Sequence, residues 1–153
     1  MDLVVPELIL VDMKAEKKEE AFGELTDALV REGAIPFYDN FLYSIKKAEE
    51  LGTSGSGFGI AIPRTRFPEI DRHRLIIGIS QVGIEWDSLD EQPVYLVFLE
   101  ICPPECPVEH LKYIELLSRS LRSETFRRFL AQSYTVDAVW QLLQDSDDGL
   151  FDA

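Results

Sequence analysis

Residues 94–101, "VYLVFLEI", form a nearly continuous run of apolar side chains, and residues 75–80, "LIIGIS", form a second one. A strand with one face in water alternates apolar and polar residues, whereas a strand covered on both faces stays apolar throughout. The two runs therefore predict neighbouring buried strands, with other parts of the chain covering both sides of their sheet.

The segments before these runs predict two more strands and two helices. Short apolar stretches at 8–11, "LILV", and 58–62, ending in "GIAI", are typical of strands. Apolar residues recur at helical spacing over 14–31, with Gly33 as the stop. A second helix is expected to be capped by Asp39 and to end at Gly52.

The last third of the chain is predicted to be helical. Pro107 suits the first turn of a helix, and Ser123 and Thr135 are expected to cap the two helices that follow. Helices thus alternate with buried strands before a helical end, which predicts an α/β fold, a single-domain three-layer α/β/α sandwich over residues 1–153. We expect the acidic end, residues 145–153, to be a frayed tail.

Composition excludes several functional classes. The 153 residues include 15 basic and 28 acidic ones, for a net charge of −13, which repels phosphate backbones and anionic lipid. The longest apolar run, "VYLVFL", is far shorter than the ~20 residues of a membrane helix, and the N-terminus has no basic region typical of a signal peptide. We expect a cytoplasmic protein that binds neither nucleic acid nor membrane, and the oligomeric state stays open.

Two cysteines and a histidine recur four residues apart in "ICPPECPVEH", at Cys102, Cys106 and His110. Structural zinc needs four ligands, most often from two close pairs, and the prolines here oppose a regular helical face. We therefore predict no metal and no cofactor, and two free thiols.

The glycine-rich stretch "GTSGSGFG", residues 52–59, does not have the form of a nucleotide site. No lysine follows it as in a Walker loop, and it enters a strand instead of linking a strand to a helix. We expect a mobile loop whose glycines permit positive φ angles.

The remaining candidates for chemistry are few. Glu49 and Glu50 are expected to be solvated at a helix end, and His73, in the charged segment "EIDRHR", is expected to be exposed. His110 falls in the first turns of a helix, where unpaired backbone N–H groups favour a nearby anion.

Several stretches resemble the type-2 enzyme IIA domain of the bacterial phosphoenolpyruvate-dependent phosphotransferase system, in its fructose, mannitol and nitrogen-regulatory branch. They are "ILVDMKAEKKEEAFGELTDALVREGAI", "AEELGTSGSGFGIAIP", "GIEWDSLDEQPVYLVFLEICPP" and "EHLKYIELLSRSLRSETFRRFL". The resemblance extends from about Leu8 to Leu143, with its motifs in order. It implies a mixed β-sheet between helical layers.

The resemblance also marks a departure. In that family the segment ends "GIAIPH", and this histidine accepts a phosphoryl group from the carrier protein HPr or a relative. Here Arg64 follows Pro63, and a guanidinium stays charged and offers no nucleophilic nitrogen. The arginine that helps to hold phosphate in the family corresponds to Ala48, whereas the second family histidine corresponds to His110.

The leading hypothesis is a regulatory protein without phosphotransfer activity, which acts by binding a protein: an HPr-like carrier, a transporter domain or a regulator. The expected anion- or partner-binding residues are Ala48, Thr53, Ser54, Gly55, Gly57, Gly59, Pro63, Arg64 and His110. One alternative is an active phosphocarrier that uses His110 or His73. Another is a small-anion sensor built from Arg64, His110 and the loop 53–59. A neutral change at position 64, in a protein that uses another surface, is also open.

Overall fold

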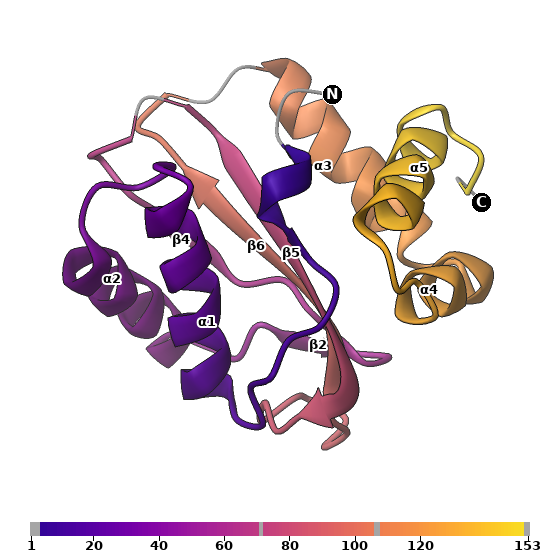
Figure 1. The fold of residues 1–153 in the computed structure, drawn as a ribbon, viewed down its shortest axis with the longest axis horizontal. Helices are drawn as coiled ribbons and strands as arrows, with labels where there is room; N and C mark the ends of the chain where they lie inside the picture. Colours follow the sequence, from indigo (N-terminus) through magenta and orange to yellow (C-terminus); the bar gives the residue numbers. More distant parts are fainter. Residues whose placement is uncertain (1–3, 71, 106–107, 152–153) are drawn as a thin grey trace.

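The centre of the fold is a six-stranded mixed sheet, seen in a computed structural model that describes residues 4–70, 72–105 and 108–151 (Figure 1). β6 lies in the middle, antiparallel to β5 along one side and parallel to β3 and β4 along the other. β1 extends the sheet beyond β5, and β2 extends it beyond β3. The strands are β1 (Ile9–Leu10), β2 (Gly55–Gly57), β3 (Ile60–Ala61), β4 (Arg64–Arg66), β5 (Arg74–Ile84) and β6 (Val94–Cys102). Each predicted strand is present, although those expected at 8–11 and 58–62 are shorter than predicted, and β3, β5 and β6 lie inside the sheet.

An irregularity interrupts the pairing of β5 with β6. The register is regular from Arg74↔Ile101 to Ile79↔Leu96, but the next pair is Ile84↔Val94. The five steps from Ile79 to Ile84 thus match only two steps of β6, so residues 80–83 form a bulge. Gly83 adopts a φ of 93° there, a conformation that favours glycine.

Helices cover both faces of the sheet. α1 (Lys18–Arg31) and α2 (Tyr38–Glu50) lie on one face, whereas α3 (Val108–Ser120), α4 (Glu124–Ala131) and α5 (Val136–Asp147) lie on the other (Figure 1). Alternate residues of β6 enter two separate apolar cores: Val97 and Leu99 pack with the first layer, and Leu96 and Phe98 with the second. This division follows from the alternating direction of side chains along a strand. The predicted three-layer sandwich is confirmed.

The helix caps test the sequence predictions individually. Ser123 Oγ accepts the Phe126 N–H at 3.3 Å, and Thr135 Oγ1 accepts the Ala138 N–H at 3.1 Å, so both predicted caps are confirmed. The prediction for Asp39 is wrong, because Phe37 occupies the N-cap position and Asp39 lies in the first turn. An acidic residue there still favours the positive end of the helix dipole. Pro107 lies outside the described residues.

The start of α1 and the end of α5 differ from the predicted bounds. α1 begins at Lys18 instead of residue 14, because the preceding residues follow the sheet: the Met13 N–H donates to the Ile79 carbonyl, and Lys17 bridges to Glu85. α5 continues to Asp147, so the start of the acidic end is helical. Beyond it, the Phe151 ring lies 4.7 Å from the ring of Phe126, centroid to centroid.

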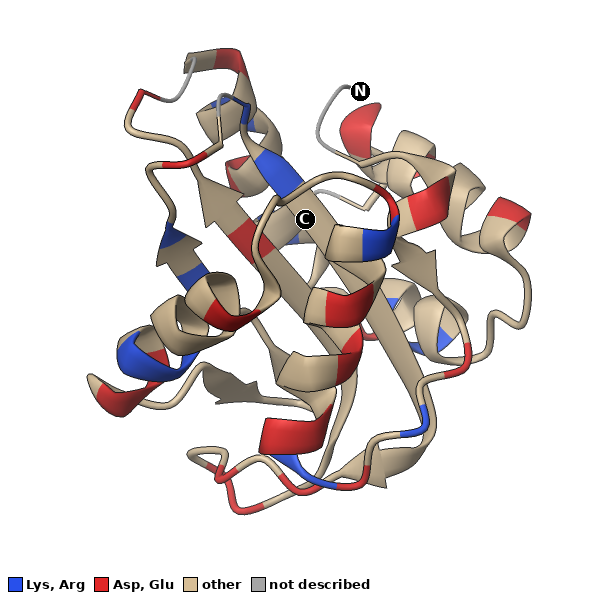
Figure 2. Cartoon of the chain, turned by 60° about the vertical axis from the view of Figure 1, so that its left-hand side comes forward, with Lys and Arg blue, Asp and Glu red and all other residues tan. Residues whose placement is uncertain are grey.

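Acidic residues occur along several elements, including α1 and α2, as the red segments of the ribbon in Figure 2 show. Within the described ranges, no helix is both long and apolar enough to cross a membrane.

Candidate functional site

Three neighbouring strands bring ionisable side chains together at one place on the sheet. Glu100 and Cys102 are two residues apart on β6, so both point toward the layer of α3–α5, as Phe98 does. Arg64 of β4 is the register partner of Glu100. The pairing Arg74↔Ile101, continued by one residue, sets His73 opposite Cys102. These residues, together with His110 of α3, are called the Glu100 cluster below.

One carboxylate oxygen is the centre of the Glu100 cluster. Glu100 Oε1 lies 2.9 Å from His73 Nε2, accepts a hydrogen bond from Cys102 Sγ at 3.3 Å, and lies 3.6 Å from Arg64 Nε. Cys102 Sγ is also 3.8 Å from His73 Nε2. The side chain of His73 is fully buried and that of Glu100 nearly so, whereas the Arg64 side chain is 59% exposed. Arg64 therefore covers the cluster from the solvent side.

The cluster favours the charged forms of His73 and Glu100. Burial alone would lower the pKa of His73, but interactions with Cys102 and Glu100 outweigh it and raise that pKa to about 9. Burial would raise the pKa of the Glu100 carboxyl, but the His73 hydrogen bond and the Arg64 charge hold it below its usual range. At neutral pH and without a bound ligand, the cluster thus contains the His73 imidazolium in contact with the Glu100 carboxylate.

His110 borders the cluster from the helical layer. Its ring centroid lies 5.4 Å from that of His73, with the rings tilted by 48°. Within the described part of the chain, His110 Nδ1 is buried and has no hydrogen-bond partner. A buried polar atom without a partner is uncommon and indicates a ligand, a proton or a rearrangement that completes the site.

The structure corrects the expectation that His73 is exposed. The charged neighbours of His73 suggested a solvated turn, but the alternation of β5 continues through it: Leu75, Ile77 and Ile79 face the same core. His73 lies two residues before Leu75, so the same alternation predicts that its side chain faces this core. The same period on β6 would have indicated that Glu100 and Cys102 share a face.

The structure separates Arg64 from the glycine-rich loop. The turn that contains Gly57 and Gly59 lies beside Tyr95, at the beginning of β6, whereas Arg64 pairs with Glu100 near its end. Between residues 95 and 100 a strand rises by about 16 Å. Pro63 is closer, because its carbonyl accepts the Glu100 N–H. Of the predicted site residues, Arg64, Pro63 and His110 therefore lie at the cluster, and Gly57 and Gly59 do not.

The loop residues next to α2 are instead held by a different carboxylate. Glu49 Oε2 lies 3.1 Å from Lys18 Nζ of α1 and accepts the Ser54 N–H at 2.9 Å. The Glu49 side chain is only 8% exposed, so the expectation that it is solvated is wrong. Ser54 Oγ in turn accepts the indole N–H of Trp86, and Thr53 Oγ1 accepts the Gly55 N–H. Ala48, half-buried on α2, precedes this network by one residue.

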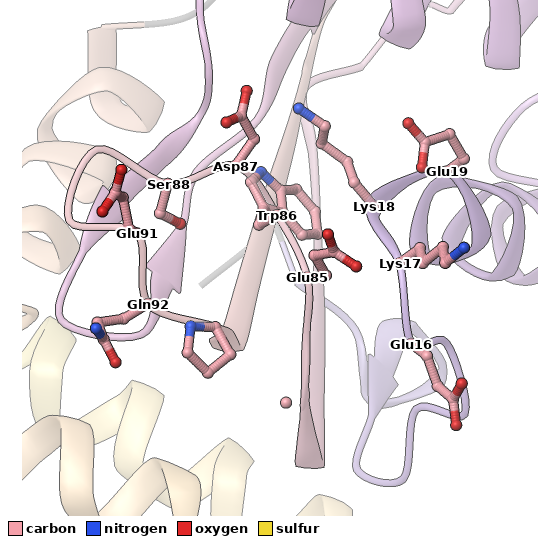
Figure 3. Close-up of a pocket in the computed structure, with 12 residues that line it drawn as sticks. Glu16, Lys17, Lys18, Glu19, Glu85, Trp86, Asp87, Ser88, Glu91 and Gln92 are labelled. Atoms are coloured by element: carbon pink, nitrogen blue, oxygen red, sulfur yellow. The ribbon is translucent and has the colours of Figure 1, made fainter.

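A hollow of about 710 Å³ lies elsewhere, between the start of α1 and the segment after β5 (Figure 3). Its lining includes two lysines and the carboxylates of Glu16, Glu19, Glu85, Asp87 and Glu91. This excess of negative charge disfavours phosphate and other anions. The hollow is therefore a poor site for phosphate, and the Glu100 cluster, to which Arg64, Pro63 and His110 belong or lie close, is the candidate functional site.

Comparison with known proteins identifies relatives along nearly the whole chain. The family model described as "Phosphoenolpyruvate-dependent sugar phosphotransferase system, EIIA 2" matches residues 2–146. A nitrogen regulatory protein of Bradyrhizobium diazoefficiens is 31% identical over 145 residues, covering 93% of this chain and 92% of its own. A fructose-specific EIIA component of Haloferax volcanii is 30% identical over 139 residues, covering 91% and 90%.

Solved structures share the fold. The nitrogen regulatory protein IIA-Ntr of Neisseria meningitidis superposes with a TM-score of 0.84 at 24% identity, over 93% of this chain and 97% of its own. Enzyme IIA for mannitol of Escherichia coli, in complex with phosphorylated enzyme IIB for mannitol, gives 0.76 at 23% identity, over 92% and 96%.

Proposed function

The chain belongs to the type-2 enzyme IIA family of the phosphoenolpyruvate-dependent sugar phosphotransferase system, and we propose that it is a regulatory member that does not carry a phosphoryl group. The proposal depends on one observation: Arg64 follows Pro63, at the position where the family resemblance implies an acceptor histidine. A guanidinium has no free lone pair with which to attack phosphorus. Arg64 also lies within 3.6 Å of the buried Glu100 carboxylate, whose negative charge opposes an incoming phosphate.

The state of His73 supports the same proposal. Phosphorylation of a histidine requires a neutral imidazole nitrogen within reach of the donor. His73 is fully buried, and its pKa of about 9 means that the imidazolium predominates at neutral pH. Both features disfavour His73 as a substitute acceptor.

A silent enzyme IIA would act through contacts with another protein in the cytoplasm. Its partner would be an HPr-like carrier, a transporter domain or a regulator. The mannitol enzyme IIA of Escherichia coli, which shares the fold, has been solved in complex with another protein, phosphorylated enzyme IIB. The net charge of −13 suits a partner with a basic face.

The second candidate function is phosphotransfer through His110. Its buried Nδ1 has no hydrogen-bond partner among the described residues, which leaves a lone pair or an N–H available for chemistry. A small-anion sensor is less well supported, because the Glu100 carboxylate already lies against the Arg64 guanidinium.

Intact mass spectrometry at neutral pH tests the proposal. The protein is incubated with phosphoenolpyruvate, enzyme I and HPr, with a relative that has histidine after "GIAIP" as the positive control. We expect no mass change in this chain and the gain of one phosphoryl group in the control. An acid-labile gain in the wild type, lost in His110→Gln, would establish the second candidate instead.

A further inference from the structure

We propose that His73, Glu100 and Cys102 form a binding site for a transition-metal ion, of which zinc is the best match. The inference goes beyond the proposed regulatory function and does not depend on it. The sequence spacing had grouped Cys102 with Cys106 and His110, whereas the structure groups Cys102 with His73 and Glu100. Cys106 lies outside the described residues and is not part of the proposed site.

The first argument is geometric. With Zn–N and Zn–O bonds of about 2.0–2.2 Å and a Zn–S bond of about 2.3 Å, tetrahedral ligand atoms lie roughly 3.3–3.6 Å apart. In the structure, the distance from His73 Nε2 to Glu100 Oε1 is 2.9 Å, from Cys102 Sγ to Glu100 Oε1 3.3 Å, and from Cys102 Sγ to His73 Nε2 3.8 Å. Each distance differs from the tetrahedral range by no more than about 0.4 Å. The three donors thus already form one face of a coordination tetrahedron.

The second argument is chemical. One imidazole nitrogen, one thiolate and one carboxylate are all donors that zinc accepts, whereas calcium and magnesium require oxygen donors alone. The three residues are each no more than 4% exposed, so the protein shields their donors from water. Among the described residues, this is a set of histidine, cysteine and acidic groups whose donor atoms all lie within 4.8 Å of one another.

The third argument comes from His110. A zinc ion with three protein ligands has a fourth position, filled by another side chain or by water. The His110 ring lies beside that of His73, and its buried Nδ1 has no partner in the described part of the chain. His110 therefore fits the fourth position, either directly or through one water molecule.

The charges balance when the metal binds. The ion displaces one proton from the Cys102 thiol and one from the His73 imidazolium, and both protons pass to water. The resulting Zn²⁺, thiolate, carboxylate and neutral imidazole carry no net charge. Arg64 adds a positive charge beside this set, on a side chain that is 59% exposed.

The charge of Arg64 allows a metal site to be distinguished from an anion site by experiment. A guanidinium 3.6 Å from Glu100 Oε1 repels a dication but attracts an anion. Arg64→Ala should therefore tighten metal binding, by roughly three- to tenfold, whereas it would abolish an anion site.

The experiment uses the full chain, reduced and stripped of metal with a chelator, and titrates it with Co²⁺ as a spectroscopic probe. We expect a thiolate-to-cobalt charge-transfer band in the near ultraviolet and ligand-field bands typical of four-coordinate cobalt, all lost when Zn²⁺ is added. Mg²⁺ in excess should not displace the cobalt. Zn²⁺ should raise the unfolding temperature of the wild type.

The variants identify the ligands. Cys102→Ser should remove the charge-transfer band, and Cys106→Ser, as the matched control, should retain it. His73→Gln and Glu100→Gln should each weaken cobalt binding by about 100-fold, and His110→Gln by about tenfold. Circular dichroism verifies that each variant is folded, and the two glutamine variants keep the test decisive if Cys102→Ser does not fold.

Two results would overturn the inference. One is a wild type without the charge-transfer band at saturating Co²⁺, and the other is a band that disappears in Cys106→Ser but not in Cys102→Ser. Neither result would affect the phosphotransfer test, because that test measures the mass of a covalent adduct.

Discussion

Two buried carboxylates, Glu49 and Glu100, are held in opposite ways. Glu49 lies on α2 against α1, where its carboxylate receives the Lys18 ammonium and the Ser54 backbone N–H. Glu100 lies on the central strand, and its nearest neighbours are groups that can gain or lose protons, His73 and Cys102. The first arrangement stabilises the fold, whereas the second can respond to a ligand or to pH.

The largest expected effect is the loss of the Glu49 network. Glu49→Ala leaves Lys18 without its partner and the Ser54 N–H without an acceptor, so we expect a loss of about 2–4 kcal/mol in the free energy of unfolding. Urea denaturation measures it. The control is Glu50→Ala, whose side chain is 66% exposed beside Lys47 and should change stability by less than ~0.5 kcal/mol. Equal losses in the two variants would contradict the comparison.

The second effect is a pH dependence that the Glu100 cluster should produce through His73. The pKa of His73 is raised to about 9 in the folded, metal-free protein, against an ordinary value of ~6.5 when unfolded. The folded state thus binds the proton more tightly, and this stabilisation is complete below pH ~6.5 and lost as the pH rises through ~9. We expect a decrease on the order of 2 kcal/mol over that interval, measured by urea denaturation in chelator.

Glu100→Gln is the matched variant for this dependence. It removes the charge that holds the proton on His73, so the pKa of His73 should fall and the decline between pH ~6.5 and ~9 should become much shallower. NMR titration of the His73 ring reports the pKa directly. A wild-type His73 that titrates near 6.5 would show that the contact with Glu100 is weaker than the geometry indicates.

The third effect tests the proposed loss of phosphotransfer, through a change of Arg64 beside Glu100. Under the proposed function, Arg64→His places an imidazole after Pro63, while Ala48 still provides no guanidinium for the phosphoryl group. We expect weak labelling from phospho-HPr, and improvement by roughly tenfold, or ~1.4 kcal/mol, when Ala48→Arg is added. The measurement is a time course of labelled phosphoryl transfer. Full activity in the single variant would show that position 48 is not needed.

The smallest effect concerns the contact between the two regions. Ser44 of α2, the helix that carries Glu49, lies 2.7 Å from Thr65 of β4, the strand that carries Arg64, oxygen to oxygen. Ser44→Ala should cost about 1 kcal/mol, because it leaves the buried Thr65 hydroxyl without this partner. The double variant with Thr65→Val should cost less than the sum of the single changes. Strict additivity would exclude the interaction.

Most of the fold could be predicted from the sequence, because its signals are local. Continuous apolar runs indicated β5 and β6, and Ser123 and Thr135 marked helix starts through side chains that reach only three residues onward. The prediction that Asp39 caps α2 is wrong, because the sequence alone does not distinguish an aspartate at the N-cap from one in the first turn of the helix.

The site was less predictable, because its signals are not local. The buried Glu49 carboxylate is paired with Lys18, which is 31 residues away in the chain, and no feature of the segment around Glu49 indicates that partner. His73 was obscured by its charged neighbours, although the alternation of β5 extends through it. Only the antiparallel pairing of β5 with β6 brings His73 to Cys102, and register is a property of two strands together.

The bulge in β5 determines where the chain can change length during evolution. Residues 80–83 form extra length that is not paired in register with β6. An insertion or deletion there can therefore leave the pairing of Arg74 to Ile79 unchanged. A deletion between Arg74 and Ile79 would instead turn every upstream side chain of the strand to the opposite face and carry His73 away from Glu100. Length differences among relatives that keep this cluster are therefore expected to accumulate in the bulge and to be absent from the six residues before it.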